Sequence, residues 1–137
     1  PLPAANEKPA ALAVLLLSST GLFLLPFFPD PLFFLVWISP LLLIVSLQVL
    51  RGRSSILDDV TKGDFTRIVS YAAAALACGF FWEMWNFFSL SKWIYSVPYV
   101  HAFQIFEMPV LGYSGYLPFG LECAVIIQLL TSTENRD

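Results

Sequence analysis

Charged side chains are scarce in this sequence. Asp, Glu, Lys and Arg make up 12% of its 137 residues, whereas 58% of the residues are hydrophobic. Soluble domains carry about 25% charged residues, and a chain with half that supply cannot cover an aqueous surface. The scarcity argues against a soluble domain and favours a lipid-facing exterior. The net charge of −3 is small and scattered, and no basic cluster suggests nucleic acid as a partner.

Residue types that bind metals are also rare. The chain has one histidine, two cysteines and no Cys-x-x-Cys motif, which argues against a haem, an iron–sulfur cluster or a zinc site. We therefore predict no metal and no other cofactor. Cys78 and Cys123 each lie in an apolar stretch, and this predicts two buried free thiols rather than a disulfide.

Long apolar runs account for most of the chain. A spanning helix needs about 20 consecutive apolar residues, and the length of the chain suits about four of them. We predict an all-α integral membrane protein, with residues 1–137 forming one membrane domain. The predicted spanning segments are residues 10–28, 32–50, 65–88 and 117–131.

Prolines and capping residues divide these runs. Residues 29–31 (PDP) predict a tight break, because proline disfavours helix at its own position and at the residue before it. Pro40 predicts a kink, which membrane helices tolerate. Residues 54–59 (SSILDD) are typical of the capped start of a short interfacial helix, and Asp64 is suited to cap the next helix.

Residues 89–116 differ from the apolar runs, because Trp and Tyr alternate there with Pro and Gly. Trp and Tyr favour the headgroup region, so we expect an interfacial or re-entrant excursion. Most of the basic residues lie between the second and third segments. The positive-inside rule then places residues 51–67 and both termini in the cytoplasm, in a multi-pass protein of the cell inner (plasma) membrane.

Three glutamates, Glu83, Glu107 and Glu122, lie inside or beside the apolar stretches. An acid at membrane depth costs about 2.5–3.5 kcal/mol on insertion scales, so it usually has a partner or a function. We take the three as candidate catalytic acids. The predicted topology puts Glu83, Glu107 and Glu122 toward one membrane face, where they could converge.

Each acid also has a structural interpretation. Glu83 and Asn86 would share a helix face with Gly79 and Leu90, either as a polar site or as a polar lock between helices. Burial without a cation would favour the neutral form of Glu83.

The other two acids leave similar alternatives open. Glu107 could face Glu83 across a pocket, or it could pair with Lys92 or His101 or cap a turn. Glu122 could complete a carboxyl cluster, or it could be an acid favoured by the N-terminal end of the helix dipole.

Aromatic residues gather around these acids. Most of them suit a core or a lipid-facing belt, but aromatic faces beside buried acids could also bind a polyene or stabilise a carbocation. The candidate ligand-binding residues are Trp82, Trp85, Asn86, Trp93, Tyr95 and His101.

Four runs resemble an uncharacterised family of bacterial multi-pass membrane proteins: CGFFWEMWN at 78–86, KWIY at 92–95, FEMPVLGY at 106–113 and LPFGLE at 117–122. The resemblance covers about the last two thirds of the chain. It implies a membrane fold but no activity, and it implies that this chain is the C-terminal part of a longer protein.

A weaker similarity is to the membrane domains of heterodimer-type lycopene cyclases, which carry a Trp-x-Tyr element and then a Pro-x-Glu-Glu element. Residues 93–95 (WIY) match the first element, and residues 118–122 (PFGLE) approximate the second with one acid at a different spacing. This similarity implies a carboxylic acid that protonates a polyene end while aromatic faces shield the cation.

Three functional hypotheses follow from the sequence. The first is an acidic and aromatic intramembrane pocket for a lipid, isoprenoid or carotenoid. The second is a non-catalytic accessory or structural subunit of a larger membrane complex. The third is an element for transport of protons or small solutes. The expected partners are membrane lipid, an isoprenoid or pigment, and other membrane subunits or a second copy of the chain.

Overall fold

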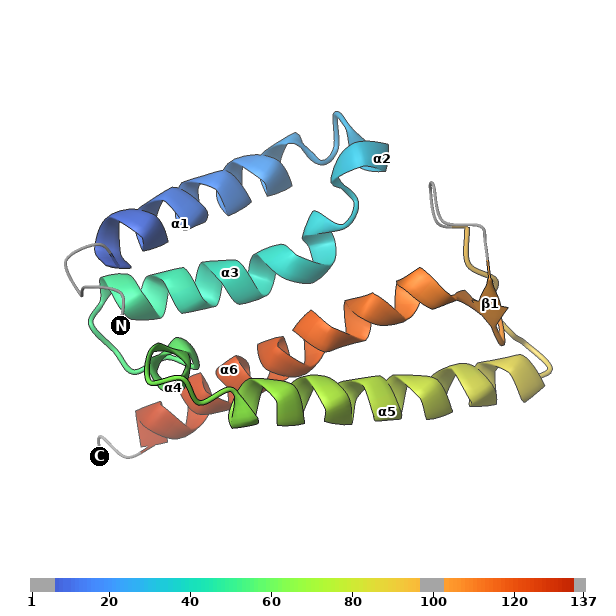
Figure 1. Ribbon diagram of the computed structural model, residues 1–137. Coiled ribbons are helices and arrows are strands. Elements are labelled where there is room, and N and C mark those ends of the chain that lie inside the picture. Colours follow the sequence, from blue (N-terminus) through green and yellow to red (C-terminus); the bar gives the residue numbers. More distant parts are fainter. Residues whose placement is uncertain (1–6, 97–102, 135–137) are drawn as a thin grey trace.

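Two helical hairpins make up the fold. The computed structural model of the chain describes residues 7–96 and 103–134. In the first hairpin α1 (Glu7–Leu24) runs antiparallel to α3 (Leu35–Leu50), and in the second α5 (Thr66–Phe88) runs antiparallel to α6 (Tyr116–Glu134) (Figure 1). The two hairpins meet where α3 packs on α6.

Short elements connect the long helices at the two ends of the molecule. The end that carries the start of α1 also carries α4, whereas the small sheet lies at the other end, beside the last turns of α5 (Figure 1). The two strands pair antiparallel, with Ile105 opposite Met108. These short elements are α2 (Pro29–Leu32), α4 (Leu57–Thr61), β1 (Gln104–Ile105), β2 (Met108–Pro109) and the 3-10 helix η2 (Val110–Gly115).

Three helical stretches are long and apolar enough to cross a membrane. They are Glu7–Leu24, Thr66–Phe88 and Val110–Thr131, of 18, 23 and 22 residues. The fourth, α3, is apolar but has 16 residues. At about 1.5 Å per residue it covers about 24 Å, against a hydrocarbon core of about 30 Å. The described ranges therefore contain three spanning-length stretches and one shorter helix, and four full spans are not confirmed.

Several helix boundaries differ from the predicted ones: α1 ends at Leu24 rather than at 28, and α3 begins at Leu35 rather than at 32. The last apolar helix is longer than residues 117–131, because η2 leads directly into α6 and extends the helical stretch back to Val110. The excursion predicted over 89–116 therefore ends earlier. The break at residues 29–31 is itself a helical turn, because prolines at the first turn of a helix lose no backbone hydrogen bond.

Both predicted caps are confirmed. The Ser55 Oγ accepts a hydrogen bond from the Leu57 N–H at 3.0 Å, and the Ser55 N–H donates to the Asp58 carboxylate at 3.1 Å. Together these bonds form a capping box at the start of α4. The Asp64 carboxylate accepts the Thr66 N–H at 2.9 Å. As predicted, Pro40 does not end α3.

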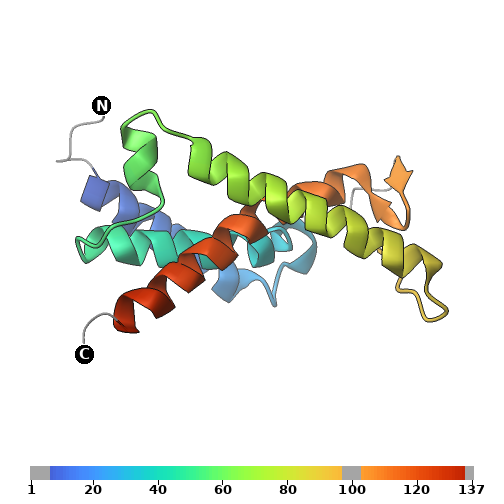
Figure 2. The same cartoon turned by 90° about the horizontal axis from the view of Figure 1, so that it is seen from below.

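Within the second hairpin, the backbones of α5 and α6 approach each other closely. Figure 2 shows α5 and α6 crossing obliquely. A β-carbon added to Gly120 would lie 2.4 Å from the Tyr71 carbonyl oxygen and 2.7 Å from the Ala75 β-carbon. No side chain fits there, so glycine is what lets α6 lie directly on α5.

Burial in this fold is inverted relative to a soluble protein. The small apolar core consists of Val45, Ile56 and Val125. Polar side chains are buried beside it and along α5, while large apolar ones point outward on every long helix. The prediction that Cys78 and Cys123 are buried was wrong: both are free thiols and both are exposed. The buried polar side chains are those of Ser18, Ser39, Ser46, Gln48, Ser55, Glu83 and Asn86.

Candidate functional site

A single stripe of α5 faces the protein interior. Gly79, Glu83 and Asn86 are the buried residues of this helix, and spacings of four and three residues place them on one face. This confirms the predicted face, except for Leu90. The helix ends at Phe88, and Leu90 lies beyond it, fully exposed.

Glu83 is the largest fully buried side chain, with 0% of its surface exposed. Its Oε1 accepts two phenol hydrogen bonds, from Tyr116 at 2.6 Å and from Tyr95 at 2.7 Å. Bonds of this length are typical of hydroxyl donors on a carboxylate. Oε2 is buried, and no hydrogen bond reaches it from the described residues. One carboxyl oxygen therefore carries both contacts, and the other carries none.

The hydrogen bonds around Glu83 have a defined direction. The Trp93 indole Nε1 donates to the Tyr95 hydroxyl at 2.6 Å. An indole N–H can only donate, so the Tyr95 oxygen accepts there and its own proton points to Glu83. Burial and the bond to Glu83 raise the pKa of Tyr95 to about 12. Tyr95 therefore remains a donor at neutral pH.

The Asn86 side chain holds the segment around Trp93 and Tyr95 by bonding to the Trp93 backbone. Its Nδ2 donates to the Trp93 carbonyl at 3.0 Å, and its Oδ1 accepts the Trp93 N–H at 2.9 Å. Both hydrogen-bonding groups of the Trp93 peptide are thereby satisfied by one side chain. Residues 89–96, which we call the strap, are thus folded back onto the buried face of α5.

The Tyr116 ring reaches Glu83 across a glycine. A β-carbon at Gly79 would lie 2.5 Å from the Tyr116 ring, so the ring rests directly on the backbone of α5. The hydroxyl then meets Glu83 one turn further along the same face. Tyr113 packs beside Tyr116, with ring centroids 6.0 Å apart. The start of α6 is therefore fixed to α5 by the same carboxyl group that holds the strap.

The hairpin of β1 and β2 packs on the end of α5 through Phe106. Its ring centroid lies 5.4 Å from that of Phe80 and 5.7 Å from that of Phe87. Phe106 has a φ of 57°, in the left-handed region that few large residues adopt. The two ring contacts stabilise this residue where its backbone conformation is unfavourable.

Glu107 follows Phe106 and makes an ion pair. Its Oε1 accepts a hydrogen bond from the Lys92 Nζ at 2.5 Å, and the Lys92 ammonium also lies 5.2 Å from the centre of the Phe87 ring. The structural interpretation of Glu107, pairing with Lys92, therefore matches the structure. Glu107 shares no hydrogen bond with Glu83 in the described part of the chain.

Glu122 lies apart from Glu83. It follows Tyr116 by six residues, which is about 9 Å along α6. It follows Gly120 by two residues, which turns it about 200° away from the contact with α5. The side chain is half-buried, and within the described ranges it has no hydrogen bond or ion pair. The structure does not bring the three glutamates into contact.

The aromatic candidates divide into two groups. Trp93 and Tyr95 belong to the network, and Trp82 stacks on Trp93 with centroids 5.8 Å apart. Trp85 points outward and is 63% exposed. His101 lies outside the described residues. The ligand-binding role of these residues stays a prediction.

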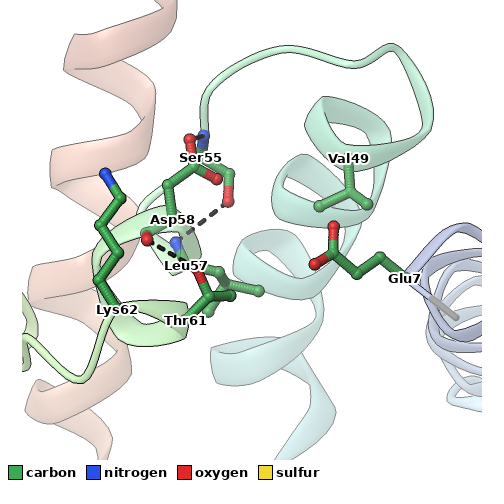
Figure 3. Close-up of a pocket in the computed structure, with 7 residues that line it drawn as sticks. All are labelled: Glu7, Val49, Ser55, Leu57, Asp58, Thr61 and Lys62. Atoms are coloured by element: carbon green, nitrogen blue, oxygen red, sulfur yellow. Dashed lines mark hydrogen bonds between the residues drawn. The ribbon is translucent and has the colours of Figure 1, made fainter. Parts of the chain in front are cut away.

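A separate pocket lies at the other end of the molecule. Figure 3 shows it between the start of α1, the end of α3 and α4, with Glu7 and Val49 on one side and Ser55 and Asp58 on the other. Asp58 is engaged in the capping box, and the Lys62 ammonium points away from Glu7. None of the residues that line it belongs to the Glu83 network.

Comparisons of the chain with family models, curated protein sequences and solved structures gave no match. Both resemblances noted in the sequence therefore stay predictions.

Sequence analysis missed the role of Tyr116 and Gly79. The network joins positions 12 and 33 residues from Glu83, and no local spacing reveals contacts at such a separation. One signal was available: the second half of the chain has tyrosines in the excursion and one acid in the α5 stripe, and a phenol can donate a hydrogen bond to a carboxyl group.

Proposed function

We propose that the chain is a polytopic protein of the cell inner (plasma) membrane. In this proposal α1, α5 and Val110–Thr131 span the bilayer and α3 lies beside them as a shorter fourth helix. The inverted burial supports it. In an 18-residue window of each apolar stretch, only 11%, 11% and 17% of the window is buried inside the protein. The remaining apolar side chains therefore need an apolar solvent.

We propose further that the protein is a non-catalytic structural module of a membrane assembly. The observation that carries this is the state of Glu83, which is fully buried with two phenol donors on one oxygen. A carboxyl group enclosed in this way cannot meet a substrate unless the strap moves. Its contacts hold three segments together, as expected of polar residues between membrane helices.

The exposed apolar surface of α5 and the strap is the part of this module available to partners. Trp82, Trp85, Phe88 and Ile94 lie on α5 and the strap with 54%, 63%, 74% and 73% of their surfaces exposed. Membrane lipid, another membrane subunit or a second copy of the chain would cover them. Hydrogen bonds with Glu83 and Asn86 hold the strap beneath this surface against α5.

The second candidate function is a pocket for a lipid, isoprenoid or carotenoid. One observation favours it: Glu83 Oε2 is a buried oxygen with no partner among the described residues. A hydroxyl group of an apolar ligand could donate to it, with Trp82 and Trp93 alongside.

Gentle purification followed by mass spectrometry of bound lipids and proteins separates the two functions. For the structural module we expect Glu83→Gln to lower thermal stability and partner recovery, because the amide is a weaker acceptor for two phenols. Glu122→Gln is the matched control and should change neither. A specific lipid or pigment that Glu83→Gln removes, with the helical content unchanged, would establish the pocket instead.

A further inference from the structure

The unpaired oxygen of Glu83 has an unusual environment. Oε2 exposes less than 1 Å² to solvent and has no hydrogen-bond partner in the part of the chain that the structure describes. A buried carboxyl oxygen without a donor is costly, because it has lost its hydrogen bonds to water and has gained none in the protein. The two donors available, Tyr95 and Tyr116, both point to Oε1.

Little can reach Oε2 while the strap is closed. Its exposed area is too small for contact with a water molecule, so in the closed arrangement an occupant larger than a proton has no access. A carboxylate oxygen that lacks a donor is also the place where a proton binds.

The titratable groups facing Glu83 come from three segments. They are Tyr95 on the strap, Tyr113 on η2 and Tyr116 at the start of α6. All three are phenols. A phenol that keeps its proton is neutral, so none of them balances the negative charge of the Glu83 carboxylate. The cation of the strap, Lys92, is paired with Glu107. The Glu83 carboxylate is therefore held by hydrogen bonds and without a cation among the described residues.

We propose that Glu83 is a proton-binding site and that binding of a proton at Oε2 releases the strap from α5. This inference rests on the structural role of Glu83 proposed above. In the ionised state two phenol hydrogens meet the negative charge, and the strap is closed. Water reaches Oε2 when the strap opens, and a proton taken up there removes the charge.

Release follows from what the proton does to the hydrogen bonds. Bonds from hydroxyl groups to a neutral acid are about half as strong as those to a carboxylate. The new O–H also lacks an acceptor, because the structure directs only donors at this carboxyl group. Tyr95 then detaches and uncovers Glu83, while Asn86 and the Lys92–Glu107 ion pair limit how far the strap moves.

Two spectroscopic measurements on the purified protein in nanodiscs test this. Infrared difference spectra during a pH titration follow the carboxylic acid band, and tryptophan fluorescence follows Trp93 as it leaves Trp82. We expect both signals to change at the same pH in the wild type. Glu83→Gln should abolish both, whereas Trp37→Phe, which removes an indole on α3, should abolish neither.

Two further variants keep the test valid if Glu83→Gln does not fold. Tyr95→Phe and Tyr116→Phe each remove one donor from the carboxylate, so the midpoint of both signals should move in each. Tyr71→Phe, which removes a phenol elsewhere on α5, is the matched control and should leave the midpoint unchanged.

The outcomes separate this inference from the proposed function. A fluorescence transition that persists in Glu83→Gln, or a midpoint that neither phenol variant moves, overturns the proton site. If the wild type shows no transition while Glu83→Gln is destabilised, the proton site is wrong and the structural role stands. If Glu83→Gln is as stable as the wild type, the structural role fails.

Discussion

Gly79 is the residue through which the α5–α6 contact can be altered without touching a polar group. Gly79→Ala puts a methyl group 2.5 Å from the Tyr116 ring, so the ring must move and its bond to Glu83 is lost. Overpacking of this kind costs about 1–3 kcal/mol. We expect the free energy of unfolding, measured by SDS titration in mixed micelles, to fall by about that amount.

Gly115→Ala is the control for this change. It adds the same methyl group one residue before Tyr116, at a position where no atom lies within 4 Å of the added carbon. We expect it to alter the free energy of unfolding by less than about 0.5 kcal/mol. Equal losses in the two variants would show that the Tyr116 contact contributes nothing to stability.

The same residues show what could be predicted from sequence at this scale. Helical spacing predicted that Glu83 and Asn86 share a face, because that relation is local. It did not predict Tyr116 as a partner, because Tyr116 lies 33 positions from Glu83 in the sequence and the contact depends on how α6 packs against α5. It wrongly extended the face to Leu90, since the helix had already ended.

At the scale of elements, the stability of the first turn of α5 should depend on pH. Hydrogen bonds from Thr66 lower the pKa of Asp64 below its ordinary value of 3.8. A lowered native pKa means that the stabilisation is complete above the unfolded-state value and is lost as the pH falls through the native value. We expect amide hydrogen exchange in the first turn of α5 to accelerate, relative to intrinsic rates, below about pH 4.

Two variants at position 64 check the cause. Asp64→Asn keeps an oxygen that can accept the Thr66 N–H, so it should preserve slow exchange and remove the dependence on pH. Asp64→Ala should give fast exchange at every pH. Acid-induced fraying that persists in Asp64→Asn would assign the effect to another group.

Element types were easier to predict than their ends. Apolar length predicted α1, α3, α5 and α6, because a run of about 20 apolar residues has few other stable forms in a membrane. The start of the last helix was missed because the glycines and tyrosines of η2 have the composition of a loop. Gly112 makes room for the Met108 side chain instead.

At the scale of the whole molecule, α4 lies at one end, and the strap and the small sheet lie at the other (Figure 1). Arg51, Arg53 and Lys62 lie at the end where α4 crosses the long helices. The positive-inside rule assigns that end to the cytoplasm in our proposal. The opposite end would face outward.

The two native cysteines test this arrangement directly. Cys78 and Cys123 are exposed on the middle of α5 and α6, so in a bilayer both thiols face hydrocarbon, where a water-soluble maleimide does not reach them. We expect no labelling of either by maleimides in intact membranes and full labelling of both after denaturation in SDS. Labelling of Cys78 in intact membranes would contradict its place in a spanning helix.

Single cysteines at the two ends, in a chain with Cys78→Ser and Cys123→Ser, then determine orientation. Ser91→Cys lies in the strap and should react with a membrane-impermeant maleimide applied to the outer face of intact spheroplasts. Arg53→Cys lies at the basic end and should react only after the membrane is permeabilised. The reverse pattern would mean that the same helices span the membrane in the opposite orientation. The basic residues of the loops determine the orientation, whereas the apolar surface of the helices determines whether they span, so one prediction can fail without the other.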